Sequence, residues 1–259
     1  MPGREQMTQR LPMIEHPIVL NPEGRFPGLI VVDHAGTDLP ERFGNLGLDP
    51  HWQRTHHFCD LWIDDVARRL AEVLDAPVIL GTVSRLVIDL NRWLEDPRSI
   101  PMQIEGIPVT GNIAMSEAER QARHDAIFWP YHRRLTDLWT GIADRHSDPV
   151  FLALHSCTRV FDGQHRPWDC GTIWNDSPRF SNALLRQLGR DSDLNLGDNQ
   201  PYSGRNGVYT IDRHTHGTGH LACGLEISND LLESSADRAA WSGRLGSTLT
   251  ALVSEGMAS

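Results

Sequence analysis

Gly28-Leu29-Ile30-Val31-Val32-Asp33-His34-Ala35-Gly36 is the stretch of this sequence that decides the fold. Its apolar, β-branched run is typical of a strand buried on both faces of a parallel sheet. The run stops at Asp33-His34, and the carboxyl end of such a strand opens into the crevice where α/β proteins bind ligands. His34 is therefore a candidate metal ligand. The alternative is a histidine that only hydrogen-bonds at a strand end.

The composition is that of an ordinary globular protein. The 259 residues are 39% hydrophobic and 22% charged, which suits one large α/β domain or two small ones. The net charge of -10 argues against a general nucleic-acid binder, and no apolar run approaches the roughly 20 residues of a membrane span. Residues 1–20 do not resemble a signal peptide, and the 4 cysteines are far apart without a CxxC pair. We expect a soluble, cytoplasmic protein with reduced cysteines and neither nucleic-acid nor membrane partners.

Predicted strands and helices alternate along the chain. After an N-terminal arm (1–27), a single domain (28–259) contains strands at about 28–33, 77–80, 83–92, 151–156, 172–174 and 221–227. Helices are expected at about 54–74, 116–145 (kinked or restarted at Pro130), 178–188 and 236–254, with a capping box at Ser116 and Glu119. Residues 196–219 are polar and rich in glycine, and we expect them to form a functional loop because the segment is too long for a simple connection. The alternation predicts a three-layer α/β/α fold with a mostly parallel central sheet.

A second strand repeats the pattern of the first. Residues 151–156 form a short apolar run that also reaches a histidine, His155, and the last predicted strand contains Glu226. A glutamate inside an apolar run is unusual without a partner. Glu226 could take a proton from a metal-bound water and pass it to a leaving amine.

The helix predicted after the first strand offers a third ligand. It begins with His56, His57 and Asp60. A hydrolytic zinc site needs three nitrogen or oxygen ligands and one open position for water, which two strand-end histidines and one carboxylate would supply. Each residue also has a structural reading, because Asp60 suits the helix N-terminus and the two histidines could be surface residues.

Arg85, Asn91 and Arg92 form another polar group, within the strand-like segment 83–92. Arginine binds carboxylates bidentately, so these residues suit an acidic small substrate. Salt bridges of Arg85 with Asp89, or of Arg92 with Asp96, are the alternative. The turn-rich run 199–204 could close over a substrate.

In several motifs the sequence resembles the N-formylglutamate amidohydrolases. The most specific shared run is Ser84-Arg85-Leu86-Val87-Ile88-Asp89-Leu90-Asn91-Arg92. The other shared features are Val32-Asp33-His34-Ala35-Gly36 with Pro40, His56 with Asp60, Pro130-Tyr131-His132, Leu154-His155-Ser156, Asn199-Gln200-Pro201-Tyr202-Ser203, and Leu225-Glu226-Ile227 before Asp230-Leu231. In order and spacing they span about residues 28–232.

The resemblance implies a fold like the zinc-dependent exopeptidases and a metal-dependent hydrolysis of an N-acyl amino acid, above all N-formyl-L-glutamate. The chain is also similar, more distantly, to zinc amidases that cut muramoyl-alanine bonds. By that analogy His34, Asp60 and His155 hold Zn²⁺ or another divalent metal, with His56 or His57 as alternatives to Asp60, and Glu226 is the general base. The substrate-binding residues we predict are Arg85, Asn91, Arg92, Asn199, Tyr202 and His216.

Three positions depart from the family pattern. Ser228 stands where the family often has an arginine, Gly36 where it usually has a serine, and Cys157 where an aromatic residue is common. If the arginine holds the acidic side chain of the substrate, Ser228 favours a hydrolase of another N-acyl amino acid or small peptide amide as the alternative. A non-catalytic zinc-binding member of the fold is a separate alternative, against which the intact set of His34, Asp60, His155 and Glu226 argues.

Overall fold

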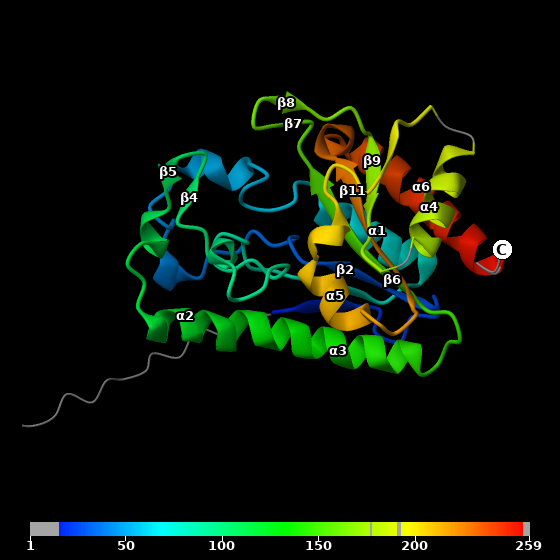
Figure 1. Cartoon of the computed structure of the whole chain (residues 1–259), viewed down its shortest axis with the longest axis horizontal. Helices are drawn as coiled ribbons and strands as arrows, with labels where there is room; N and C mark the ends of the chain where they lie inside the picture. The colour runs from blue at the N-terminus through cyan, green and yellow to red at the C-terminus, as the bar shows by residue number, and fades with distance from the viewer. Residues whose placement is uncertain (1–15, 177, 191–192, 256–259) are drawn as a thin grey trace, which may run out of the picture.

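A seven-stranded sheet organises the chain in the computed structural model, which describes residues 16–176, 178–190 and 193–255 (Figure 1). Its order is β1-β3-β2-β6-β11-β9-β10. The strands are β1 (Ile18–Leu20), β2 (Gly28–Val32), β3 (Val78–Leu80), β6 (Val150–Cys157), β9 (Cys170–Ile173), β10 (Leu196–Asp198) and β11 (Leu221–Ser228). β3, β2, β6 and β11 run parallel, β1 and β9 join them antiparallel, and β10 runs parallel to β9.

Helices cover both faces of the sheet. α1 (Ile63–Leu74), α4 (Arg179–Gly189) and α6 (Ser235–Ser254) pack on the face that carries Ile30 and Val32. α3 (Trp129–Ala143) and α5 (Tyr209–Thr215) pack on the face that carries Leu29 and Val31 (Figure 1). Because helices cover β2 on both faces of the sheet, its residues are all apolar and do not alternate with polar ones. The predicted three-layer α/β/α fold is therefore confirmed.

The predicted helix 116–145 forms as a succession of helical segments. α2 (Glu117–Arg123) begins with the predicted capping box of Ser116 and Glu119, a π-helical turn follows at His124–Phe128, and α3 then begins at Trp129. Pro130 is the second residue of α3, directly after the π-helical turn, and the backbone stays in the right-handed helical region from α2 into α3. The predicted kink or restart at Pro130 therefore takes the form of a change of helix type just before the proline, without a break in the helix.

The remaining segments are short. Two hairpins stand outside the main sheet, β4 (Gln103–Ile104) with β5 (Ile107–Pro108), and β7 (Val160–Phe161) with β8 (Gln164–His165). Single 3₁₀ turns occur at Glu41–Phe43, Pro50–Arg54, Pro97–Ser99, Thr110–Asn112, Gly204–Asn206 and Asn229–Leu232.

Two predicted elements are wrong. The helix expected at 54–74 begins only at Ile63, because Trp62 has a left-handed backbone (φ 69°) that interrupts any earlier helix. Residues 83–92 form no strand, although Val83 makes an isolated parallel bridge with Asp38. The alternation of apolar residues in this segment is misleading, because Val87 on its polar side is fully buried as well.

Two other segments hold more structure than the sequence predicted. Residues 196–219, expected to be a loop, contain β10 and the helix α5. The segment expected to be an arm contains β1, which pairs with the edge of the sheet at β3, whereas residues 1–15 lie outside the described part of the chain.

Two further observations bear on the sequence predictions. The 4 cysteines are buried and none forms a disulfide, as expected from their spacing. Within the described residues, every helix is too short or too polar to cross a membrane.

Candidate metal centre

His34, Asp60 and His155 meet at the carboxyl ends of the central strands. His34 follows β2, His155 lies in β6, and Asp60 reaches them from the loop before α1, where its backbone N–H donates to the His34 carbonyl (2.9 Å). Asp60 Oδ2 lies 3.6 Å from Nδ1 of His34 and 2.7 Å from Nδ1 of His155. All three residues are buried, and one ligand atom from each lies within 4.8 Å of the other two. The fold thus brings together the three metal ligands predicted from the sequence.

Each histidine of this group turns its other nitrogen towards a second carboxylate. Nε2 of His34 donates to Asp89 Oδ1 at 2.7 Å, and Nε2 of His155 lies 3.7 Å from Asp33 Oδ2. Thr210 holds Asp33 in place by donating its hydroxyl to Oδ1 (2.9 Å). A hydrogen bond such as that between His34 and Asp89 is how proteins orient metal-binding histidines. The sequence prediction gave neither Asp33 nor Asp89 a role beside a metal ligand, and considered Asp89 only as a salt-bridge partner of Arg85, although both lie in the shared motifs.

The donor set fits a divalent cation. Nδ1 of His34 is buried, has no hydrogen-bond partner in the residues that the structure describes, and lies 3.6 Å from the Asp60 carboxylate. Burial opposes ionisation of Asp60, but His34 and His155 hold its pKa below the ordinary value, so it is a carboxylate. Two imidazole nitrogens and one carboxylate oxygen are ligands typical of catalytic zinc.

Glu226 lies beside this group. β11 and β6 pair in parallel with Glu226 opposite His155, so the two side chains come from neighbouring strands at the same level. Its Oε2 is buried and has no hydrogen-bond partner within the described part of the chain. Burial raises the pKa of Glu226 to about 7, although the charge of His155 opposes the shift. A carboxylate with a pKa near neutrality is suited to accept a proton and return it.

Arg85 and Arg92 face carboxylates of the protein itself. Arg85 donates to Asp89 Oδ2 (2.8 Å, Nη2) and to Asp60 Oδ1 (3.3 Å, Nη1). Arg92 lies 3.5 Å from Asp89 and 3.6 Å from Asp96. The salt bridges considered as alternatives from the sequence therefore exist. Both side chains keep some exposure, 24% for Arg85 and 31% for Arg92, through which they could still reach a ligand.

Asn91 and Asn199 hold the backbone of neighbouring segments. The Asn91 side chain accepts from the backbone N–H of Thr210 (2.9 Å), which places α5 against the site. The Asn199 side chain accepts from Trp174 (2.9 Å) and Gly204 (3.1 Å) and so shapes the loop that carries Tyr202. Their substrate-binding roles stay predictions.

His56 and His57 lie outside the group that could hold a metal. Their rings are 4.0 Å apart, and His57 Nε2 contacts Glu105 Oε1 at 3.0 Å. Burial, followed by the charge of His57, lowers the pKa of His56 to about 4. The geometry thus favours Asp60 over these two as the third ligand.

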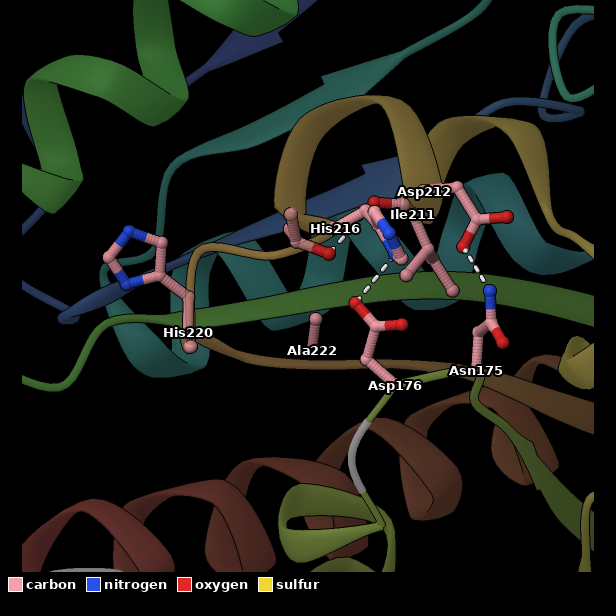
Figure 2. Close-up of a pocket in the computed structure, with 9 residues that line it drawn as sticks. Asn175, Asp176, Ile211, Asp212, His216, His220 and Ala222 are labelled. Carbon is pink, nitrogen blue, oxygen red and sulfur yellow. Dashed lines mark hydrogen bonds and ion pairs between the residues drawn. The ribbon is translucent and has the colours of Figure 1, made fainter.

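His216 lies in a different place. It follows α5 and pairs with Asp176 at 2.7 Å in a small pocket that also contains His220 and Ala222 (Figure 2). Ala222 is near the start of β11, four residues before Glu226, which corresponds to about 13 Å along a strand. The substrate-binding role predicted for His216 has no support from a contact with the candidate metal ligands among the described residues.

A family model matches most of the sequence, and two solved structures share the fold. The sequence model of the family "N-formylglutamate amidohydrolase" matches residues 26–233. The crystal structure of a gene product from Agrobacterium tumefaciens superposes with a TM-score of 0.86 at 31% identity, over 92% of this chain and 95% of that chain. The structure of an N-formylglutamate amidohydrolase from Ralstonia eutropha JMP134 shares the fold, with a TM-score of 0.72 at 21% identity over 92% and 97% of the two chains. No curated protein matches the sequence.

Proposed function

The chain belongs to the N-formylglutamate amidohydrolase family, and we propose that it is a zinc-dependent hydrolase that splits N-formyl-L-glutamate into formate and L-glutamate. The observation that carries this proposal is the buried group of His34, Asp60 and His155 beside Glu226. It combines a metal-binding donor set with a carboxylate whose Oε2 has no hydrogen-bond partner among the described residues.

The residues have separate roles in the proposed reaction. His34, Asp60 and His155 would hold zinc, which polarises an amide carbonyl and lowers the pKa of a bound water to about 7. Asp89 orients the His34 imidazole through a hydrogen bond, and Asp33 lies 3.7 Å from Nε2 of His155.

Glu226 moves the protons. Its Oε2 receives a proton from the attacking water and returns it to the leaving nitrogen, so that formate and a free amine result. The partly exposed Arg85 and Arg92 bind the α-carboxylate next to the scissile amide.

A second candidate substrate class follows from Ser228. Its side chain is buried, 1% exposed, and supplies no charge where the family often has an arginine. Another N-acyl amino acid is therefore the alternative substrate. Measuring turnover of a series of N-formyl and N-acetyl amino acids distinguishes the two.

Zinc content and turnover test the proposal together. We expect His34→Ala and His155→Ala to lose bound zinc, whereas His51→Ala, at an exposed histidine paired with Asp49, should keep it. Glu226→Gln should keep its zinc and lose about 10²–10⁴-fold in turnover, the usual cost of a lost acid–base group. Undiminished zinc in both histidine variants would refute the ligand assignment, and near-normal turnover of Glu226→Gln would refute its role.

A further inference from the structure

We propose that Arg166 binds the side-chain carboxylate of the substrate and thereby sets a preference for acidic N-acyl amino acids. The inference rests on the proposed function and adds a specificity-determining residue to it. Neither the sequence motifs nor the candidate metal centre includes Arg166.

Arg166 lies at the carboxyl edge of the sheet, next to the catalytic strands. The hairpin β7–β8 leaves β6 shortly after His155 and stands beyond the ends of β6 and β11 (Figure 1). Arg166 follows β8, and its backbone N–H donates to the carbonyl of Arg159 (2.8 Å). Arg159 in turn pairs with Asp169 and Asp230, each at 3.0 Å. The base of the hairpin is thus tied to the neighbouring segments.

Aromatic rings hold the Arg166 guanidinium in position. It lies 4.5 Å from the ring centre of Phe161 and 4.6 Å from that of Tyr202. Its Nη1 also donates to the Tyr202 hydroxyl at 2.9 Å. Contact with two rings and a hydroxyl restrains a long side chain before the ligand arrives, which lowers the entropic cost of binding.

The cluster of Arg166, Phe161 and Tyr202 lies near Glu226. After burial, the carboxylate of Glu226 is the largest influence that raises the pKa of the Tyr202 hydroxyl, so these two groups lie within electrostatic range. On the other side, Phe161 contacts the ring of His56, with centroids 6.1 Å apart. Arg166 therefore belongs to the rim of the same site rather than to a separate surface.

The charge of Arg166 has no carboxylate partner among the described residues, unlike the charges of Arg85 and Arg92. Its Nη1 donates hydrogen bonds to the Tyr202 hydroxyl and to the carbonyl of Thr158. Nε and Nη2 have no acceptor within the described part of the chain, and this edge of the guanidinium is a fork that matches a carboxylate.

We assign the two carboxylates of the substrate to different arginines according to how far each arginine lies from the metal ligands. Arg85 bonds directly to Asp60, so it lies beside the metal ligands, where the α-carboxylate next to the scissile amide would sit. Arg166 lies farther out, on the hairpin, where the distal carboxylate of an acidic side chain would reach.

Binding measured without turnover tests this assignment. The zinc-loaded Glu226→Gln protein is titrated by calorimetry with N-formyl-L-glutamate and with the uncharged N-formyl-L-glutamine. Adding Arg166→Met should weaken binding of the first ligand about 10–100-fold, the effect of a charge-assisted hydrogen bond, and leave the second within about threefold. Arg166→Lys should restore part of the difference. Arg205→Met is the matched control, since Arg205 also stacks on an aromatic ring, 4.8 Å from the centre of Trp174.

The outcomes separate this inference from the proposed function. Equal losses for both ligands, no loss for either, or the same loss with Arg205→Met would overturn the role of Arg166. Binding of N-formyl-L-glutamate that depends on Arg166, in a protein whose wild type has no turnover, would support the inference and refute the proposed function. Normal turnover with no effect of Arg166→Met would do the reverse.

Discussion

Asp89→Asn tests whether a carboxylate behind His34 controls metal binding. The Asp89 carboxylate accepts two hydrogen bonds, one on Oδ1 from Nε2 of His34 (2.7 Å) and one on Oδ2 from Nη2 of Arg85 (2.8 Å). Asparagine has nearly the same shape but only one acceptor oxygen. If that oxygen faces His34, the amide NH₂ points at the Arg85 guanidinium; if it faces Arg85, the NH₂ points at the imidazole N–H. Either orientation sets a donor against a donor.

The size of the effect follows from these contacts. Removing a carboxylate that orients a ligand histidine typically weakens metal binding 10–100-fold, or by about 1.4–2.7 kcal/mol. The metal-free protein should also lose about 2 kcal/mol of unfolding free energy, since one charge-assisted hydrogen bond disappears. Asp33→Asn should weaken zinc binding less than Asp89→Asn, because Asp33 lies 3.7 Å from His155.

Competition with a chromophoric chelator gives the zinc affinity, and urea unfolding of the metal-free protein gives the stability. Asp96→Asn is the matched control, since Asp96 lies in the same segment and pairs with Arg98 at 2.7 Å without contacting a metal ligand. Zinc affinity of Asp89→Asn equal to that of the wild type would refute the reasoning. The same loss in Asp96→Asn would show that the segment, rather than the carboxylate, is responsible.

Two further predictions concern stability. Burial lowers the pKa of His132 to about 3 and that of His214 to about 4, so both imidazoles stay neutral in the folded protein. In the unfolded chain the same two histidines take up protons below about pH 6.5, which favours unfolding. Each histidine should therefore lower the unfolding free energy by about 2 kcal/mol at pH 5 relative to pH 8. Urea unfolding at both pH values checks this, and His214→Gln should reduce the measured difference by about 2 kcal/mol; an unchanged difference would contradict the assignment. Gly36→Ser should lower the unfolding free energy by about 1–3 kcal/mol, because a Cβ there would lie 2.0 Å from the backbone of Thr82, whereas Gly243→Ala, in an open position of α6, should raise it by up to about 1 kcal/mol. Thermal unfolding compares the two, and a Gly36→Ser variant as stable as the wild type would show that the backbone yields.

Local patterns in the sequence were sufficient for the framework of the fold. The apolar runs of β2, β6 and β11 and the cap at Ser116 are properties of short segments, and they predicted those elements correctly. The order of strands and helices then placed His34 and His155 at one edge of the sheet, because parallel strands end on the same side.

Which residues hydrogen-bond to one another across the fold could not be inferred from such local patterns. Residues 83–92 alternate like a strand, yet they fold as buried turns because Asp89 bonds to His34, 55 positions away in the sequence. Asp60 was expected on a helix and instead lies before it, bonded to the backbone of His34.

Whether an arginine is already neutralised also depends on the tertiary structure. Arg85 pairs with Asp60 and Asp89 and can reach a ligand only through the exposed 24% of its side chain, whereas Arg166 contacts two aromatic rings and has no carboxylate partner among the described residues. The sequence by itself determined which chemical groups this protein has and at which edge of the sheet they stand. The tertiary structure decided which of those groups neutralise one another and which are left for metal and substrate, because hydrogen bonds and ion pairs depend on distances between residues that are remote in the chain.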